Sequence, residues 1–186
     1  MGKITAFNFI SLDGYYEASP GDISWHQHDA EGNKFSEEML AANNTLLFGR
    51  VTYELMVSYW PTPYALENDP IVAAGMNKAE KIVFSQTLKE ASWNNTSLMK
   101  HNILEEIKSL KQKDGKNMAI LGSGSIITQF AQAGLIDEYQ LLIDPIAIGG
   151  GTSIFRGIKN KLPLKLKKTK VFKNGSVLLC YEPATE

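Results

Sequence analysis

The chain has 186 residues, of which 44% are hydrophobic and 21% are charged. This composition is typical of a globular protein and allows one domain with a sizeable core. With 19 basic and 20 acidic residues, the formal net charge is −1, which provides no general attraction for nucleic acid or an anionic membrane. We therefore expect a single domain over residues 1–186 that binds a small molecule and neither a nucleic acid nor a membrane.

The cysteine content and the first residues favour a cytoplasmic location. Cys180 is the one cysteine, so the chain has no disulfide framework. It lies in an apolar run and is interpreted as a core residue of a strand. The apolar stretch at the N-terminus is interrupted by Thr5, Asn8 and Ser11, and therefore predicts neither a signal peptide nor a membrane span.

Strand-like runs and helix-like segments alternate along most of the chain. The predicted strands are residues 3–10, 45–48, 81–85, 118–121, 138–143, 164–173 and 176–182. The predicted helices are residues 31–43, 52–60, 102–112 and 125–134, the third capped by Asn102 and the last ended by Gly134. Asn174-Gly175 predicts a tight hairpin between the last two strands. The predicted fold class is therefore α/β, with a mixed sheet flanked by helices.

Three of the predicted strands lead into polar turns. Gly49 and Arg50 follow the strand at 45–48, and Ser85 ends the strand at 81–85. The sequence Gly-Ser-Gly-Ser follows the strand at 118–121. Glycines allow close approach of the backbone to a ligand, and the N–H groups at a helix start attract anions. Since open α/β sheets bind ligands at the carboxyl ends of their strands, these turns together predict a site for a phosphate-bearing ligand.

Alone, the Gly-Ser-Gly-Ser turn has two other interpretations. One is an ordinary strand-to-helix turn in which Ser123 or Ser125 caps the helix. The other is a Rossmann fingerprint, with Asp144 ending the next strand where an acid that binds ribose is expected. The third glycine of that fingerprint is replaced by Ile127, and the chain after Asp144 has the pattern of a loop and a hairpin. Both features disfavour the Rossmann interpretation.

The chain as a whole resembles the dihydrofolate-reductase-like superfamily, and more closely the C-terminal reductase domain of the bifunctional riboflavin-biosynthesis deaminase–reductase. The matching segments are FISLDGYYE (9–17), LLFGRVTYE (46–54), KIVFS (81–85), ILGSGSIITQFAQAGLIDEYQLLIDPIAIGGGTSIF (120–155) and the terminal hairpin. They cover nearly the whole chain in the family's order. The resemblance implies three α/β/α layers around a mixed, mostly parallel sheet of about eight strands that ends in an antiparallel hairpin, with NADPH as hydride donor.

The resemblance also implies roles for individual residues. The expected cofactor-binding residues are Leu12, Gly49, Arg50, Thr52, Ser85, Gly122, Ser123, Gly124, Ser125, Ile126 and Gly150, the last together with Gly149 and Gly151. The expected substrate-binding residues are Gly14, Trp25 and Arg156. Lys159 and Lys161, near the late glycine loop, are further candidate cations for a substrate phosphate, which the resemblance does not itself assign. Asp13 is the expected proton donor. The implied activity resembles that of 5-amino-6-(5-phosphoribosylamino)uracil reductase, and a homodimer is expected because such reductases are often dimeric.

Departures from the family patterns leave the substrate open. One cysteine is too few for the zinc signature of a nucleobase deaminase. Dihydrofolate reductases carry a pterin-binding carboxylate shortly after a tryptophan, but no acidic residue after Trp25 has that spacing. These acidic residues are Asp29, Glu31, Glu37 and Glu38. The alternatives are therefore a reductase of a pterin or another small carbonyl compound, and a nucleotide-binding protein without catalysis.

The pair His26 and His28, followed by Asp29, has the spacing of metal ligands on an extended segment. The chain has just one further histidine, His101, and no acidic cluster with clear ligand spacing. We therefore expect no metal site, and interpret this segment as a solvated loop, with a loop that contacts the substrate as the alternative.

Overall fold

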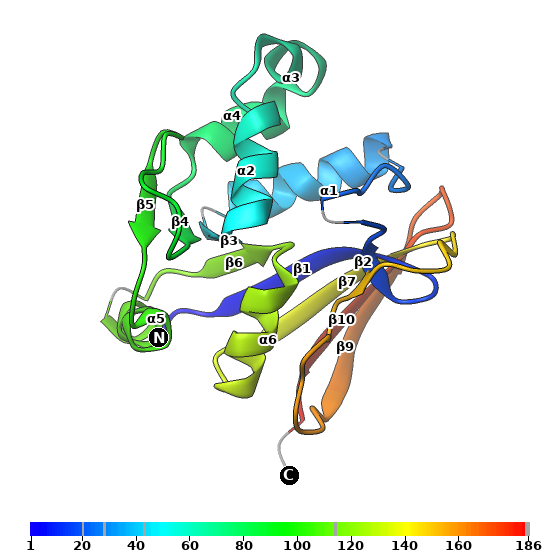
Figure 1. The fold of residues 1–186 in the computed structure, drawn as a ribbon. Coiled ribbons are helices and arrows are strands. Elements are labelled where there is room, and N and C mark those ends of the chain that lie inside the picture. The colour runs from blue at the N-terminus through cyan, green and yellow to red at the C-terminus, as the bar shows by residue number, and fades with distance from the viewer. Residues whose placement is uncertain (20, 28, 43, 114, 185–186) are drawn as a thin grey trace.

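The computed structural model describes residues 1–19, 21–27, 29–42, 44–113 and 115–184. An eight-stranded sheet with the order β5-β4-β3-β6-β1-β7-β10-β9 forms its centre (Figure 1). The strands are β1 (Ile4–Ser11), β3 (Thr45–Gly49), β4 (Lys81–Phe84), β5 (Thr96–Met99), β6 (Met118–Leu121), β7 (Glu138–Asp144), β9 (Leu164–Val171) and β10 (Val177–Pro183). β10 pairs antiparallel with β7 and β9, whereas the other pairs in this sheet are parallel. The predicted mixed, mostly parallel sheet with a terminal hairpin is confirmed.

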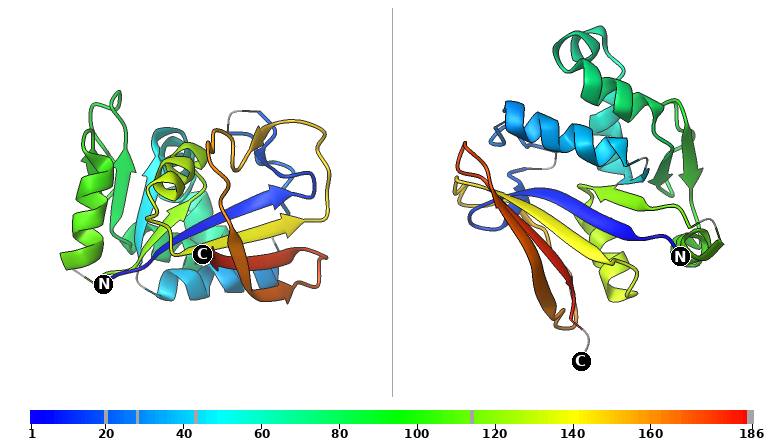
Figure 2. Two further views of the ribbon diagram at one scale, coloured as in Figure 1. Left: turned by 90° about the horizontal axis from the view of Figure 1, so that it is seen from below. Right: turned by 180° about the vertical axis from the view of Figure 1, so that it is seen from behind.

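Helices cover both faces of this sheet (Figures 1 and 2). α1 (Ala30–Ala41), α2 (Arg50–Tyr59) and α4 (Pro70–Lys78) pack on one face, and α5 (Ile103–Lys113) and α6 (Gly124–Gln132) pack on the other. The chain also forms a small second sheet, in which β2 (Tyr15–Glu17) pairs antiparallel with β8 (Thr152–Ser153). None of the helices within the described ranges has the length and apolar character needed to cross a membrane.

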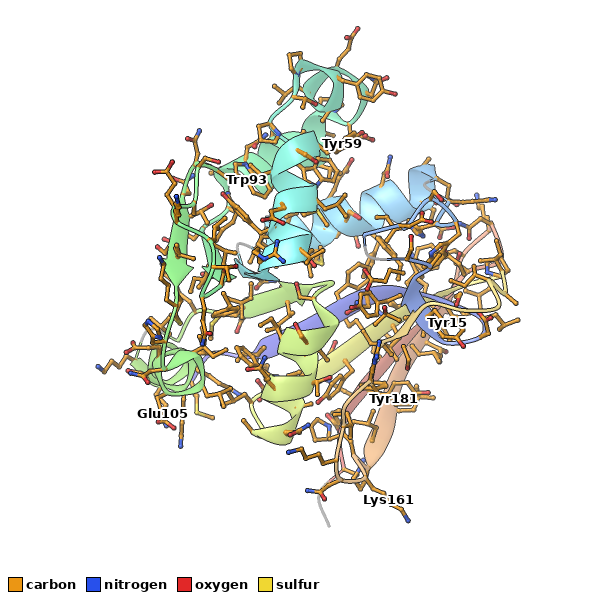
Figure 3. The ribbon with its side chains drawn as sticks, viewed as in Figure 1. Tyr15, Tyr59, Trp93, Glu105, Lys161 and Tyr181 are labelled. Atoms are coloured by element: carbon orange, nitrogen blue, oxygen red, sulfur yellow. The ribbon has the colours of Figure 1, made fainter. Side chains whose placement is uncertain are left out.

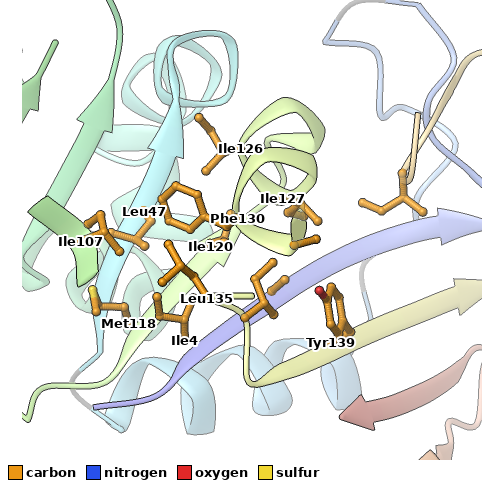
Figure 4. Packing of buried hydrophobic residues seen from close by; sticks show 14 of the residues in the cluster. Ile4, Leu47, Ile107, Met118, Ile120, Ile126, Ile127, Phe130, Leu135 and Tyr139 are labelled. Atoms are coloured by element: carbon orange, nitrogen blue, oxygen red, sulfur yellow. The ribbon is translucent and has the colours of Figure 1, made fainter. Parts of the chain in front are cut away.

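The core has two layers because alternate side chains of a strand point to opposite faces of the sheet. In β1, Ile4 and Ala6 belong to the cluster under α5 and α6, while Phe7 belongs to the cluster under α1 and α2. Figure 4 shows the first cluster, where Phe130 of α6 packs among aliphatic side chains of the strands. Burial on both faces explains why the central strands are nearly continuous apolar runs in the sequence.

The structure contains elements that the sequence patterns did not predict. α3 (Pro63–Asn68) and α4 each begin with a proline in the first turn, and the Thr62 hydroxyl accepts a hydrogen bond from Ala65 N at 3.2 Å. This region is rich in proline and aromatic residues, which conceals its helical pattern. β5 is a partly exposed edge strand without an apolar run, and β2 and β8 are too short to show a period. These five elements depend on tertiary contacts more than on local sequence.

The predicted terminal hairpin is confirmed. Gly175 has φ +91°, and its N–H donates to Phe172 O at 3.0 Å, while Phe172 N donates to Ser176 O at 2.9 Å. A glycine with positive φ at this position gives the hairpin the twist of its strands. Cys180 lies in β10 and is buried, as expected of a core residue.

Candidate active site

The carboxyl ends of the parallel strands meet at one edge of the sheet. β3 ends at Gly49, β6 at Leu121 and β1 at Ser11, and β6 lies between β3 and β1 in the sheet. The connection from β1 to β3 crosses the face covered by α1, and the connection from β6 to β7 crosses the face covered by α6. Such a change of face is a topological switch point, where open α/β sheets bind their ligands.

The hydroxyl of Ser123 joins the turn after β6 to the turn after β3. Gly49 N–H donates to Ser123 Oγ at 2.7 Å, and this oxygen donates to Thr52 Oγ1 at 2.9 Å. Ser123 is buried, has φ 60° and makes no side-chain capping bond to α6. The predicted N-cap position of Ser123 is confirmed, but its hydroxyl does not cap the helix. Its side chain instead holds two of the three predicted turns against each other.

The turns pack closely, and a glycine is required at Gly122, whereas Gly49 has room for a Cβ in ordinary van der Waals contact. A Cβ added to Gly122, which has φ +61°, would lie 3.2 Å from Thr52 Cγ2. A Cβ added to Gly49 would lie 3.4 Å from both Ser123 Oγ and Ile126 Cγ1. α2 begins directly after Gly49, and α6 begins two residues after Gly122, so both helix N-termini lie at this edge. Their N–H groups and partial positive charge fit an anion such as a pyrophosphate.

The remaining predicted residues of this region have different exposures. Ser125 is exposed at the start of α6, whereas Ile126 is buried in the core, so that only the backbone of Ile126 is suited to face a ligand. Arg50 is exposed, and its Nη1 donates to Glu54 Oε2 at 2.8 Å. Ser85 Oγ accepts a hydrogen bond from Leu88 N at 2.9 Å and stabilises the turn after β4. Arg50 and Ser85 thus flank the joined turns on the side of β3 and β4.

Asp13, in the turn after β1, makes hydrogen bonds to the loop after β7. Ser11 Oγ donates to Asp13 Oδ1 at 2.6 Å, and the carboxylate also accepts from Ile148 N at 3.2 Å and Gly149 N at 2.8 Å. The Ser11 hydroxyl, followed by these backbone N–H groups, holds the pKa of Asp13 below its usual value. A proton donor at neutral pH needs a raised pKa. The geometry therefore favours a role for Asp13 in positioning the loop over the predicted role as proton donor.

The three consecutive glycines of this loop have different surroundings. Gly149 has φ +74° and donates to Asp13, as described above. A Cβ on Gly151 would lie 2.1 Å from Glu17 O of β2, so that no larger residue fits there. Gly150 has no atom within 4 Å of an added Cβ, and Leu12 in the facing loop is 70% exposed. Gly150 and Leu12 therefore border open space at the mouth of the site.

Tyr16 of β2 lies directly on the start of α6. Its Cε1 atom and its hydroxyl oxygen are 2.7 Å and 3.0 Å from the position of a Cβ added to Gly124. Burial raises the pKa of Tyr16 to about 12, with a further contribution from the carboxylate of Glu17, while Gly124 and Arg156 oppose the rise. Neither the matching segment at 9–17 nor an apolar period in the sequence assigned a role to Tyr16. The reason is that β2 has three residues and pairs with a strand distant in the sequence.

A buried contact between a histidine and a carboxylate lies on the opposite face of the sheet from α6. His26 Nδ1 and Asp144 Oδ2 are 2.5 Å apart, and their side chains are 5% and 4% exposed. Asp144 Oδ1 also accepts from Ser176 Oγ at 2.9 Å, and the His26 ring stacks on Phe9 with centroids 3.6 Å apart. The interpretation of this segment as a solvated loop is therefore wrong at His26, while His28 lies outside the described residues. Asp144 is engaged by these partners rather than available for a ribose.

The carboxylate of Asp29 accepts a hydrogen bond from Gly32 N at 2.7 Å and caps α1. This role explains why a carboxylate follows the histidines in the sequence. Over the ranges that the structure describes, no three His, Cys, Asp or Glu side chains are grouped as a metal site would require.

Comparison with known proteins identifies the family. The model of the RibD C-terminal domain matches residues 2–178. The chain belongs to the RibD C-terminal domain family. Its similarity to the uncharacterized protein YyaP of Bacillus subtilis (strain 168) is 31% identity over 172 residues, which covers 92% of this chain and 90% of that protein.

Solved structures confirm the expected fold of this RibD C-terminal domain. A dihydrofolate reductase from Enterococcus faecalis, complexed with NADP(H) and RAB-propyl, is similar with a TM-score of 0.69 at 19% identity, over 99% of this chain and 98% of that one. A deaminase/5-amino-6-(5-phosphoribosylamino)uracil reductase from Thermotoga maritima is similar with a TM-score of 0.70 at 15% identity, over 98% of this chain and 57% of that one. The fold is therefore dihydrofolate-reductase-like, and the family is that of reductases of the riboflavin-pathway type.

Two buried polar atoms lie in this RibD C-terminal domain, one in a residue that the sequence predicted for the site and one in a residue that it missed. Asn8 Oδ1 of β1 and Trp25 Nε1 are buried and have no hydrogen-bond partner within the described part of the chain. Buried polar atoms in native proteins are nearly always paired, so that each such atom requires an explanation. Trp25 was predicted as a substrate residue, whereas Asn8 was noted for interrupting an apolar stretch. Each atom therefore keeps an unused hydrogen-bonding capacity inside the described part of the protein.

The predicted substrate cations are not all at the cleft. Arg156 lies close enough to Tyr16 to affect the pKa of its hydroxyl, and its backbone carbonyl accepts from Thr128 Oγ1 at 3.1 Å. Lys161 precedes β9, which begins at the edge opposite the cleft, far from Tyr15 of β2 (Figure 3). The expectation that Lys161 helps to bind a substrate phosphate at the cleft is therefore wrong.

Proposed function

We propose that this protein is an NADPH-dependent reductase of a small pyrimidine or ribosyl compound, resembling 5-amino-6-(5-phosphoribosylamino)uracil reductase. The observation that carries the proposal is the Ser123 hydroxyl, which joins two glycine turns and two helix N-termini at the switch point of the sheet. Membership of a reductase family supports it, and so does the fold shared with a dihydrofolate reductase complexed with NADP(H).

The residues at the joined turns fit the phosphates and the adenosine end of NADPH. The turn at 122–125 offers backbone N–H groups and no bulky side chain, which suits a pyrophosphate. Thr52 and the exposed Arg50 lie at the start of α2, and a guanidinium suits a phosphate because it offers a forked pair of donors. Ser85, at the end of β4, would lie near the ribose and its 2′-phosphate.

The chain itself would orient and enclose the reactants. NADPH, when bound, supplies the hydride. Leu12 and Gly14 border the mouth on one side and Gly150 on the other, and the Asp13 carboxylate keeps these two loops together. Hydride transfer depends on orientation and exclusion of water more than on a nucleophile. Asp13 is ionised when it accepts these bonds, so the substrate proton would come from another donor.

The unpaired buried atoms suggest how the substrate is recognised. The Asn8 carboxamide accepts and donates hydrogen bonds, and Trp25 Nε1 donates one. A pyrimidine ring with adjacent C=O and N–H groups satisfies both kinds of atom. Arg156, in the loop after β8, would contact a ribosyl phosphate. A reductase of a pterin or another small carbonyl compound is the second candidate, since a pterin offers the same ring groups.

Titration of NADPH against the protein, followed by NADPH fluorescence, tests the cofactor. We expect saturable binding that Arg50→Ala weakens about tenfold, because it removes a charged hydrogen bond to phosphate. Lys108→Ala, which removes an exposed charge from α5, is the matched control and should bind as the wild type does. Absence of saturable binding would refute the proposal. NADPH oxidation with 5-amino-6-(5-phosphoribosylamino)uracil, compared with dihydrofolate, then separates the two substrate classes.

We propose a single reductase domain that acts in the cytoplasm as a homodimer, by analogy with similar reductases. Light scattering after size-exclusion chromatography tests the dimer. A monomeric mass at micromolar concentrations would contradict it.

A further inference from the structure

We propose that Tyr16 is a displaceable plug of the phosphate cradle, so that its side chain must leave the start of α6 before a dinucleotide binds. The inference rests on the proposed function, since it concerns the regulation of the same cleft. In this proposal the Tyr16 side chain and the pyrophosphate of the dinucleotide compete for the same place, which neither the family nor the fold implies.

The contact between Tyr16 and Gly124 carries the proposal. The phenol ring reaches within 2.7 Å, and its oxygen within 3.0 Å, of the place where a Gly124 Cβ would lie. Gly124 is the first residue of α6, and its N–H is one of the groups expected to face a pyrophosphate. The phenol oxygen therefore occupies space that a phosphate oxygen would need. The ring and a phosphate cannot both lie on this glycine.

Two of the three polar groups around the Tyr16 hydroxyl would also favour a bound phosphate. The Gly124 backbone lowers the pKa of Tyr16, as expected if its N–H donates to the phenol oxygen, and Arg156 acts in the same direction. The carboxylate of Glu17 acts in the opposite direction. A neutral phenol thus uses the N–H and the nearby cation that would favour an anion. A phosphate that replaced the ring would interact favourably with the Gly124 N–H and with Arg156. Of these three groups, Glu17 is the one that would repel it.

The local backbone allows Tyr16 to move without unfolding the site. Tyr15 pairs with Ser153 and Glu17 with Thr152, and the register shifts between them, so that Tyr16 is the extra residue of a bulge. Bulges redirect single side chains and are common beside active sites. Tyr16 is half-buried and packs against the border of the core cluster rather than inside it, so its departure would leave the fully buried residues in place.

Binding calorimetry with three ligands tests the plug. NADPH and 2′-phospho-ADP-ribose contain the pyrophosphate, whereas 2′-AMP lacks it and serves as the control ligand. Tyr16→Ala should bind the first two about fivefold more tightly, because the binding-competent state no longer has to expel the ring. Tyr16→Phe keeps the ring but loses the hydroxyl, and should bind them with an intermediate gain. Binding of 2′-AMP should be unchanged in both variants.

Tyr15→Ala is the matched control variant, because Tyr15 is the neighbouring residue of β2, whereas the three atoms nearest to a Cβ added at Gly124 all belong to Tyr16. It should leave the affinity for all three ligands unchanged. The melting temperature of each variant checks folding, and Tyr16→Phe is the conservative variant if Tyr16→Ala unfolds. A structure with 2′-phospho-ADP-ribose should have the Tyr16 ring away from Gly124.

The contrary outcomes are distinct from one another. Weaker or equal binding of the pyrophosphate ligands by Tyr16→Ala would overturn the plug while leaving the cofactor site intact. An equal gain of affinity in Tyr15→Ala, or a gain of affinity for 2′-AMP, would also overturn the plug. Either result would show that the change in affinity is not specific to the contact between Tyr16 and the pyrophosphate. If neither the wild type nor any variant binds any of the three ligands, the proposed function itself fails.

Discussion

Ser123 Oγ lies 2.7 Å from Gly49 N, and this one hydrogen bond connects turns that are 74 residues apart in the chain. The same oxygen lies 2.9 Å from Thr52 Oγ1. The bond determines how the starts of α2 and α6 are placed relative to each other. Because both helix starts are proposed to hold phosphates, the serine hydroxyl is a positioning group for the whole cleft.

Ser123→Ala should lower both stability and cofactor affinity. It leaves the buried Gly49 N–H without its acceptor, which costs about 1–3 kcal/mol of unfolding free energy. Urea denaturation measures this loss, and NADPH titration measures the affinity. Ser125→Ala is the control for stability, because Ser125 is exposed. Equal stability of Ser123→Ala and wild type would contradict the proposed positioning role.

Gly151 and Gly150 should differ sharply in tolerance to alanine. Gly151→Ala places a methyl group 2.1 Å from Glu17 O at a φ of +147°, so the β2–β8 sheet must separate. Gly150→Ala meets no atom within 4 Å and should melt at the wild-type temperature. Thermal unfolding of the two variants tests the difference. If Gly150→Ala retains stability but binds NADPH more weakly, the proposal that Gly150 borders the cofactor is supported.

The Asp13 carboxylate should make stability depend on pH in the acid range. Its pKa is lowered in the folded protein by the Ser11 hydroxyl and the neighbouring N–H groups. The contribution is therefore present above the unfolded pKa, about 3.9, and is lost as the pH falls through the lower folded pKa. Asp13→Asn lacks this carboxylate, so its stability should fall less than that of the wild type below about pH 4. Parallel curves from denaturant titrations between pH 7 and pH 2.5 would contradict this.

Lys81 should make stability rise with pH as well, but in the alkaline range. Its side chain is buried, and Nζ donates to Met76 O at 2.9 Å and Ala79 O at 2.6 Å. Burial lowers the pKa of Lys81 from 10.5 to about 8. Between these two values the unfolded chain binds more protons than the folded one, so stability should rise with pH. Lys81→Met removes the titrating group, and its stability should show a flatter dependence from pH 8 to 10.5.

Much of the framework was predictable because its signals are local. The apolar runs of the central strands, the glycine turns and the Asn174-Gly175 hairpin each follow from residues close in the chain. α3 and α4 were missed because prolines and aromatic residues conceal their pattern, although the prolines are favourable in a first helical turn. His26 was misjudged because its partner Asp144 is 118 residues away in the sequence.

The amino-acid sequence alone determined the order of strands and helices, the family resemblance and the position of the glycine turns. These features depend on side-chain period, backbone freedom and turn chemistry within a few residues. Tertiary structure alone decided that the Ser123 hydroxyl joins two turns instead of bonding to its own helix, that Asp13 holds a loop, and that Tyr16 lies on Gly124. Each of these contacts joins separate segments, and only the folded sheet and its crossing connections bring their atoms within hydrogen-bond or van der Waals distance.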